Sequence, residues 1–417
     1  IAKALRLAVE RSRTRRKTEH RQRFAVVSPV PPQASGVADY TSELVTALVR
    51  YADVEVFVDR GVAPSVALAR STVHDARRLG ERVRDAGFEE VFHQVGASTF
   101  HCFVDEAARS VPGIVTLHDL GWGRVPHHLA RTPADQSSFR RELRRLEGPE
   151  ALREFDEIVG RGWTGEGDLL DGFFRRHPML GDLVGSSRGV IVHFPEAEAL
   201  LRRQFPSVPV RYFPMGVADP LRDGVAGTVE IRTRLRLPLS GFVAGVFGIA
   251  DPVKRLDAAV RAVAQLADEG RDATLVVVGR FLSEAYRAEL RDLATRLAVG
   301  DRVRFLGSPS LPDFEALIAS CDVSVNLRYP SRMQMSAVLL RSLAAGVPVA
   351  ITDLPEWGFL PTGACERIPA DSSEVDRLAS FLREMLADPE ERARRGRVAR
   401  KWYLENATVD AMASGYL

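Results

Sequence analysis

The stretch from Gly241 to Val263 constrains the fold of this chain more than any other. It opens with an apolar run at 242–247 that has the length and composition of a buried strand. Gly248 interrupts the run, and Asp251-Pro252 signals a turn before apolar residues recur at helical spacing. Strand, glycine turn and helix in this order place backbone N–H groups and the positive end of a helix at the carboxyl edge of a sheet, where phosphates bind.

Lys254 lies inside this turn. The chain has only four lysines against 53 arginines, so nearly every other cation is a guanidinium. A lysine at the mouth of such a turn indicates a compact point charge on a flexible stem, which arginine does not replace well. We therefore predict that Lys254 binds phosphate, together with Gly248 of the same turn; an ordinary surface cation is the alternative.

Length and charge narrow the class of protein. A chain of 417 residues exceeds what one core usually supports, so we expect two domains. Residues 1–23 carry nine Lys or Arg against two Glu, a net charge of +7, which leaves −5 for the remainder. An acidic body argues against nucleic-acid binding, which needs a basic face on a folded domain. Three widely spaced cysteines lack metal-ligand spacing, so we expect buried thiols in a reducing compartment.

The basic segment 1–23 has two interpretations. It is a solvated linker, or it contacts an anionic membrane surface, as a lipid-linked acceptor would require. No apolar run approaches transmembrane length and no secretory signal is recognisable, so we expect a cytoplasmic protein, at the inner face of the membrane if the basic segment binds lipid. Because the chain begins with Ile1, we expect it to be part of a longer or processed polypeptide.

Apolar runs that alternate with amphipathic helices predict an α/β fold with two doubly wound parallel sheets. The predicted strands are 24–27, 54–58, 89–95, 113–117, 190–193 and 210–213, then 242–247, 274–278, 303–306, 323–327 and 347–351. The first predicted helix spans 41–50, after a Pro-rich loop. The predicted domains are a basic segment 1–23, a first Rossmann-like domain 24–222 with a helical insertion at about 121–185, a second Rossmann-like domain 223–395, and C-terminal helices 396–417 that cross back to the first domain.

Several segments, in order and spacing, resemble a retaining glycosyltransferase of the large family 4 type, with GT-B architecture. The resemblance covers residues 24–417. The segments are SGVADY at 35–40, VTLHD at 115–119 and GVIVH at 189–193, then FG at 247–248, KRLD at 254–257, CDVSVNLRYP at 321–330 and SLAAGVPV at 342–349.

This resemblance implies a nucleotide-sugar donor, UDP- or GDP-linked, held mainly by the second domain, with no metal and no other cofactor. His118 would touch the donor sugar or the reaction centre, and Gly36 would offer its N–H to the diphosphate. Ligands of doubly wound sheets lie beyond the carboxyl ends of strands, where both residues fall. The expected catalytic residues are His118, Lys254 and Gln334, and the expected donor-binding residues are Gly36, Gly248, Lys254, Arg255, Met335, Ser336 and Ala337.

The acceptor is expected to be a glycan or a lipid-linked molecule bound on the first domain. Asp119 and His193 end or follow predicted strands there, and Trp122 could stack on a sugar. A core position for either histidine, and a packing role for the tryptophan, remain alternatives. The pair His127-His128 lacks a carboxylate or cysteine at ligand spacing, which argues against a metal site.

One departure from the family pattern concerns the loop before the helix predicted at 335–345. Members of the family usually carry a glycine–glutamate pair where this chain has Met333-Gln334, and Ser342 stands where a second glutamate is common. Glutamine can bond a sugar hydroxyl but brings no negative charge, and Met333 occupies a site where close backbone approach favours glycine. A non-catalytic subunit of the same fold, and a sugar-nucleotide epimerase, are therefore competing hypotheses.

Overall fold

The computed structural model describes residues 21–33, 35–64, 68, 71–121, 132–160, 168–221, 228–235, 237–331 and 333–417. The chain divides into two compact units. The first consists of Ile1–Gly216, Arg332–Met335 and Val409–Leu417, and the second of Val217–Ser331 and Ser336–Thr408. Each unit is built on one parallel sheet.

The sheet of the first unit has the strand order β3-β2-β1-β4-β5-β6-β7, and all its neighbours are parallel. Its strands are β1 (Arg23–Val27), β2 (Asp53–Val58), β3 (Thr72–Asp75), β4 (Glu90–Val95), β5 (Ile114–Leu117), β6 (Gly189–Val192) and β7 (Val210–Tyr212). Its α-helices are α2 (Gly36–Leu48), α3 (Leu79–Ala86), α4 (Cys102–Ser110), α6 (Pro133–Gly160), α7 (Asp168–Arg176), α8 (Gly181–Gly185), α9 (Pro195–Gln204) and α17 (Val409–Tyr416).

The sheet of the second unit has the order β10-β9-β8-β11-β12-β13 and is also parallel throughout. Its strands are β8 (Phe242–Phe247), β9 (Ala273–Val278), β10 (Val303–Phe305), β11 (Val323–Asn326), β12 (Val349–Thr352) and β13 (Cys365–Ile368). Its α-helices are α10 (Thr228–Arg234), α11 (Leu256–Asp268), α12 (Glu284–Arg296), α13 (Leu311–Ser320), α14 (Ala337–Ala344), α15 (Glu374–Ala387) and α16 (Pro389–Asn406).

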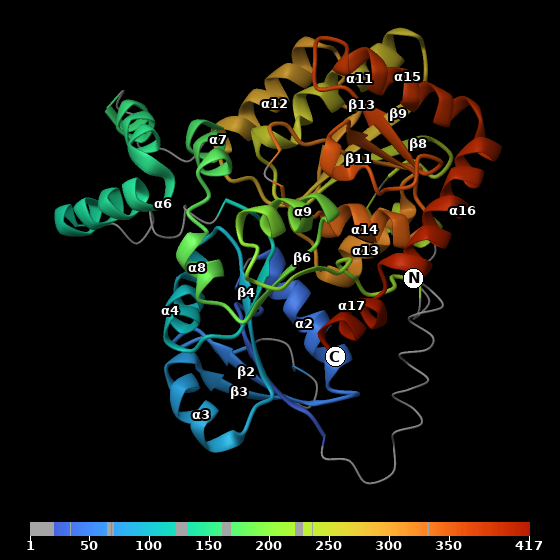
Figure 1. Ribbon diagram of the computed structural model, residues 1–417. Helices are drawn as coiled ribbons and strands as arrows, with labels where there is room; N and C mark the ends of the chain where they lie inside the picture. Colours follow the sequence, from blue (N-terminus) through green and yellow to red (C-terminus); the bar gives the residue numbers. More distant parts are fainter. Residues whose placement is uncertain are drawn as a thin grey trace. The chain divides into compact units, whose positions relative to one another are not determined.

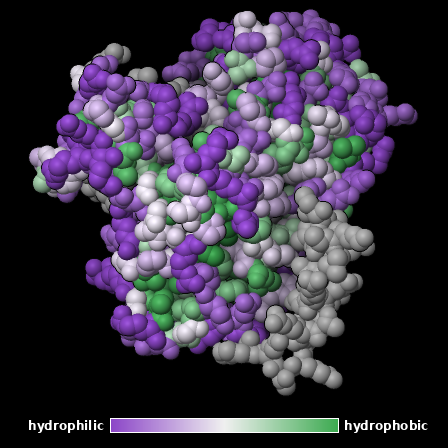
Figure 2. Space-filling view, in the orientation of Figure 1, coloured by the Kyte–Doolittle hydropathy of each residue, from purple (hydrophilic) through white to green (hydrophobic). Residues whose placement is uncertain are grey.

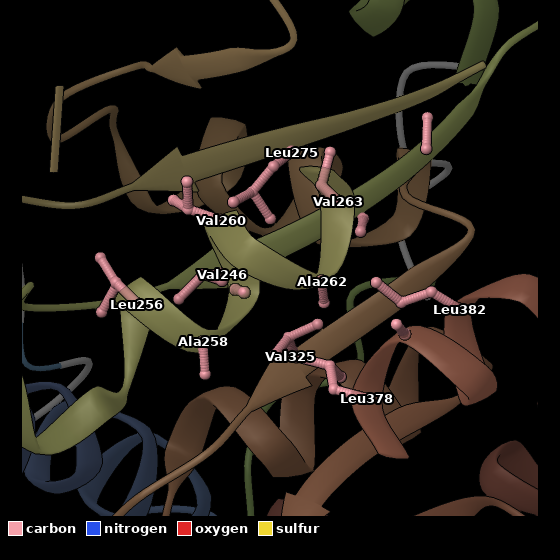
Figure 3. Packing of buried hydrophobic residues seen from close by; sticks show 14 of the residues in the cluster. Val246, Leu256, Ala258, Val260, Ala262, Val263, Leu275, Val325, Leu378 and Leu382 are labelled. Atoms are coloured by element: carbon pink, nitrogen blue, oxygen red, sulfur yellow. The ribbon is translucent and has the colours of Figure 1, made fainter. Parts of the chain in front are cut away.

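Both faces of the second sheet are covered by helices, which explains why its strands are almost entirely apolar. On one face Ala244 and Val246 pack with α11, α12 and α15. On the other, Val243 and Phe247 pack with α10 and α13. Figure 1 shows α11, α12 and α15 on one side of this sheet and α13 and α14 on the other. Figure 3 shows Val260, Val263 and Leu275 of the first cluster, with Leu378 and Leu382 of α15 nearby.

Strand order 3-2-1-4-5-6 recurs in the two sheets, and it defines where ligands can bind. The order reverses between β1 and β4 in the first unit and between β8 and β11 in the second. In a doubly wound sheet the loops at such a point diverge and leave a crevice beyond the carboxyl ends of the strands. The turn after β8 and the helix after β1 start at these two points.

The predicted insertion is present as helices α6, α7 and α8. Phe139, Phe155, Phe173 and Phe174 form a small core of their own between α6 and α7. Residues over α6 are largely hydrophilic on the face drawn in Figure 2. Gly148, at φ 91°, interrupts the helical conformation inside α6 and separates its two amphipathic pieces.

The prediction of two doubly wound parallel sheets is confirmed, and each predicted strand has a counterpart within two residues of the predicted bounds. The prediction missed β3, β13 and the helices α3 and α10. It also placed the first helix too late: α2 begins at Gly36 rather than at residue 41, because the Ser35 side chain caps it by accepting from the Val37 N–H.

The C-terminal boundary lies later than residue 396. Helix α16 packs against α14 and belongs to the second unit, and the chain returns to the first unit only at Val409. There α17 packs beside α2, as Figure 1 shows, and Arg50 forms an ion pair with Asp410. The predicted domain limit at residues 222–223 falls in 222–227, outside the described residues, and the unit boundary follows Gly216.

The three cysteines are free thiols, as predicted. Cys321 and Cys365 are buried, and burial raises the pKa of each thiol, the latter to about 12. Cys102 is only half-buried. Within the described parts of the chain no helix is long and apolar enough to cross a membrane.

Gly396 tests the packing of α16 against α14. A Cβ at this position would lie 2.3 Å from the carbonyl oxygen of Gly346, closer than real contacts permit. We expect Gly396→Ala to lower the free energy of unfolding by about 1–3 kcal/mol, because a well-packed contact must open. Urea unfolding measures this change. Gly185→Ala, at the end of α8 with nothing within 4 Å, is the control; equal effects of the two changes would contradict the packing.

Candidate functional site

The turn after β8 is built around Gly248. Its φ of 88° lies in the left-handed region, and its N–H donates to the carbonyl oxygen of Val278 at 2.8 Å. A Cβ on Gly248 would lie 2.7 Å from the Lys254 Nζ. The turn therefore requires glycine for its conformation and for the close approach of the lysine.

Lys254 ends a short 3-10 helix, Pro252–Lys254, and its side chain folds back over the turn. Nζ donates to the carbonyl oxygen of Phe247, the last residue of β8, at 2.8 Å. An ammonium group has three donors, and one of them is directed at this carbonyl oxygen. The charge is thus held at the carboxyl end of a central strand.

The start of α14 lies next to the same turn. The Cγ2 atom of Val338 lies 3.4 Å from the position that a Cβ on Gly248 would take. Ser336 is the N-cap: its Oγ accepts from the Leu339 N–H at 3.2 Å and from the Arg328 Nη2 at 2.9 Å. The helix dipole and the first amides of α14, beginning with Ala337, add positive potential beside Lys254.

Met335 and Ser336 are both buried just before this helix, so Ser336 contributes a cap and Ala337 the first helical amide. The second unit therefore brings four predicted donor-binding residues together: Gly248, Lys254, Ser336 and Ala337. Such an arrangement of one ammonium group, one glycine turn and one helix N-terminus suits a phosphate group.

Arg255 has a structural partner. It caps α11 in a left-handed conformation, at φ 55°, and its guanidinium binds Glu374 of α15 through both carboxylate oxygens at 2.6–3.2 Å. The Glu374 side chain is buried, so the pair ties the start of α11 to α15. A role of Arg255 in donor binding stays a prediction beside this observed one.

In the first unit, β4, β5 and β6 end side by side. Val95 pairs with Leu117, and Leu117 pairs with Val192, so the residues that follow lie next to each other. His118 and His193 are both buried there, with ring centroids 5.2 Å apart. The sheet thus brings together the two histidines that the sequence analysis singled out.

Both histidines are held neutral. Burial, and to a smaller extent the neighbouring His193 and His101, lower the pKa of His118 well below its usual value. Burial lowers the pKa of His193 to about 4, although its Nδ1 bonds the carbonyl oxygen of Phe213 at 2.9 Å. His118 Nε2 lies 2.9 Å from Oε1 of Gln94, a buried residue of β4. A neutral imidazole offers one donor and one acceptor.

Asp119 has a local structural function. Its Oδ2 accepts from the Ala97 N–H at 3.0 Å and its Oδ1 from the Gly121 N–H at 3.1 Å, so it joins the loops after β4 and β5. The acceptor-binding role assigned to Asp119 stays a prediction.

Gly36 is the first residue of α2, and among the described residues no heavy atom beyond its chain neighbours lies within 4 Å of where its Cβ would be. Internal packing therefore does not require glycine here. Its position at a helix N-terminus beyond β1 is compatible with the predicted approach of a phosphate.

The loop with Met333 and Gln334 groups with the first unit. Met333 adopts φ 47°, the left-handed conformation that glycine takes without cost, as its place in the family pattern suggests. Gln334 is half-buried. Trp122, the pair His127-His128 and residues 1–20 lie outside the described residues. In the described parts of the chain, no group of three or more His, Cys, Asp or Glu is arranged to hold a metal ion.

The sequence analysis missed Gln94. The sequence feature that could have identified Gln94 is its polar side chain in a strand where most other residues from 91 to 95 are apolar. The structure shows this side chain fully buried. Glu374 carried no comparable signal, because its partner Arg255 is 119 residues away.

Comparisons with known proteins agree with this geometry. Residues 229–402 match the family model "Glycosyl transferases group 1". This match covers the sheet of the second unit and most of its helices. A GDP-mannose-dependent alpha-(1-6)-phosphatidylinositol monomannoside mannosyltransferase of Mycobacterium tuberculosis is 28% identical over 225 residues, which are 50% of this chain and 55% of the relative. The chain therefore spans about half the length of this curated relative.

Solved glycosyltransferase structures share the fold across nearly the whole chain. The sucrose-phosphate synthase of Thermosynechococcus elongatus superposes with a TM-score of 0.66 at 19% identity and covers 95% of this chain and 97% of its own. HepE of Anabaena, in complex with UDP and glucose, gives a TM-score of 0.65 at 15% identity, with 95% and 98% covered. The expected GT-B architecture is thereby confirmed.

Met333 offers a test of the loop conformation. A non-glycine residue in the left-handed region costs about 1–3 kcal/mol, partly offset by the backbone entropy that glycine loses on folding. We expect Met333→Gly to raise the free energy of unfolding by about 1 kcal/mol. Urea unfolding tests this, with Met335→Gly as control, since buried Met335 has no positive φ and its truncation should destabilise. A loss of stability in Met333→Gly would contradict the assigned conformation.

Proposed function

We propose that this chain is a glycosyltransferase that moves a sugar, with retention of anomeric configuration and without a metal ion, from a UDP- or GDP-linked donor to an acceptor. The observation that carries the proposal is the cluster of Gly248, Lys254 and the capped start of α14 at the carboxyl edge of the second sheet. Its charge and amides suit a diphosphate leaving group.

The proposed chemistry needs little from acidic side chains. As the bond between the anomeric carbon and the phosphate oxygen breaks, negative charge grows on the diphosphate, where Lys254 and the α14 amides stabilise it. The departing phosphate oxygen takes the proton of the acceptor hydroxyl, which forms its new bond on the same face of the sugar. In this scheme Gln334 hydrogen-bonds a sugar hydroxyl and is not required as a base.

The first unit supplies the proposed sugar and acceptor contacts. His118, neutral and buried at a strand end, can bond a hydroxyl of the donor sugar without adding charge. Asp119, His193, Trp122 and the Gly36 N–H complete the predicted set on this unit. The acceptor class that we propose is a glycan or a lipid-linked molecule, with residues 1–23 as a contact to the inner face of a membrane in a cytoplasmic protein.

The relatives and structural neighbours differ in the base of the nucleotide that their names or complexes contain. The mycobacterial relative is named GDP-mannose-dependent, whereas HepE was solved with UDP and glucose. Thermal unfolding with UDP, GDP, ADP and TDP discriminates among the bases. At about 100 times the dissociation constant a ligand adds about 2.7 kcal/mol of stability, a rise in Tm of about 5–10 °C for a domain of this size.

We expect one nucleoside diphosphate to raise the Tm of the wild type and the rise to be largely lost in Lys254→Ala. Lys401→Ala is the matched control, because it removes an exposed lysine of α16 in the same unit. Loss of the shift in both variants would point to net charge rather than to the turn. No shift with any nucleotide would contradict the proposal and favour a non-catalytic subunit of the same fold.

A further inference from the structure

Tyr416, at the end of α17, lies in a buried cluster of polar side chains in the first unit. Its hydroxyl oxygen is 2.8 Å from the hydroxyl of Tyr40, 2.9 Å from Oγ1 of Thr116 and 3.3 Å from Nε2 of Gln94. A phenol hydroxyl can donate once and accept twice, so these three contacts use its full capacity. All four side chains are at most 5% exposed.

Gln94 connects this cluster to the candidate site. Its Nε2 donates to Tyr416, and its Oε1 accepts from Nε2 of His118 at 2.9 Å. With both ends of the amide engaged, the His118 ring carries its proton on Nε2, and the lone pair lies on Nδ1. An inverted amide would present its NH2 group to His118 and demand the opposite tautomer.

We propose that Tyr416 is a positioning residue: it holds the amide of Gln94 in one orientation and thereby fixes His118 as the Nε2–H tautomer. His118 then offers Nδ1 as a hydrogen-bond acceptor to a sugar hydroxyl. In this way the last helix of the chain determines which ring nitrogen of His118 carries the proton. This inference rests on the proposed function for its consequence, although the tautomer itself does not depend on turnover.

Neighbouring groups support the assignment. The Tyr40 ring packs edge-on to His118, with centroids 4.5 Å apart, so Tyr40 restrains both the histidine ring and the Tyr416 hydroxyl. Within this cluster His118 donates to Gln94 and Gln94 donates to Tyr416, whose hydroxyl also contacts the hydroxyls of Tyr40 and Thr116. A buried network of this kind orients its members, because a turned Gln94 amide would require the hydroxyl of Tyr416 and the proton of His118 to change places together.

The test uses the full chain labelled with ¹⁵N-histidine. Imidazole nitrogen resonances report the tautomer directly, and the His118 signals are assigned from their absence in His118→Asn. In the wild type we expect a protonated Nε2 and an unprotonated Nδ1 for His118. In Tyr416→Phe, which keeps the ring and removes the hydroxyl, we expect a mixture of tautomers and a kcat about tenfold lower with the donor KM within about twofold.

Tyr403→Phe is the matched control. Tyr403 is also buried in a C-terminal helix, but its hydroxyl donates to the carbonyl oxygen of Val217 at 3.0 Å, in the second unit. We expect this variant to keep the His118 resonances of the wild type. Unchanged His118 resonances in Tyr416→Phe, or equal changes in both variants, would overturn the proposal.

A second variant covers the case in which Tyr416→Phe does not fold. Gln94→Met removes both amide groups at similar size, and it should release the tautomer in the same way; a retained Nε2–H tautomer would refute the role of Gln94. A fixed tautomer in a protein without transferase activity would support the positioning role and contradict the proposed function, whereas activity with an unfixed tautomer would do the opposite.

Discussion

The contact between the Lys254 Nζ and the carbonyl oxygen of Phe247 underlies the rest of this account. It exists only because Gly248 lacks a Cβ and takes a positive φ, which lets the lysine lie across the end of β8. The same space admits Val338 and so the start of α14. One turn therefore concentrates an ammonium group and a helix dipole at the point where the strand order reverses.

The first unit has a group of buried, neutral polar side chains of its own. Three strand ends in register bring His118 and His193 together, and burial keeps both rings uncharged near pH 7. In each ring one nitrogen donates to a protein oxygen, Oε1 of Gln94 for His118 and the carbonyl oxygen of Phe213 for His193, so the other nitrogen is an acceptor.

Local patterns were enough to predict much of the fold. The run at 242–247 and its glycine turn were predicted with the bounds that the structure shows, because apolar composition and a left-handed glycine are local properties. Strands β3 and β13 were not predicted, because Thr72–Asp75 and Cys365–Ile368 lie at sheet edges and carry polar residues. The start of α2 was predicted too late, because the Ser35 cap begins the helix directly after the Pro-rich segment.

In the candidate site, too, residues in one local motif could be predicted, whereas contacts between distant residues could not. Gly248 and Lys254 could be found because they are six residues apart in one motif, whereas the partners of Gln94 and Arg255 could not. Tyr416 is 322 residues from Gln94, and Glu374 is 119 residues from Arg255. No periodicity or spacing encodes such pairs; they follow only from the way the sheet and its helices pack. The sequence therefore predicts candidate binding groups, and the structure adds the buried side chains that contact them.

A crystal structure of the wild-type protein grown with the nucleoside diphosphate that stabilises it tests the central claim most directly. The account predicts that the diphosphate lies on the turn after β8, with phosphate oxygens within hydrogen-bonding distance of the Lys254 Nζ and of the first amides of α14. A nucleotide bound elsewhere on the chain, with this turn unoccupied, would contradict it.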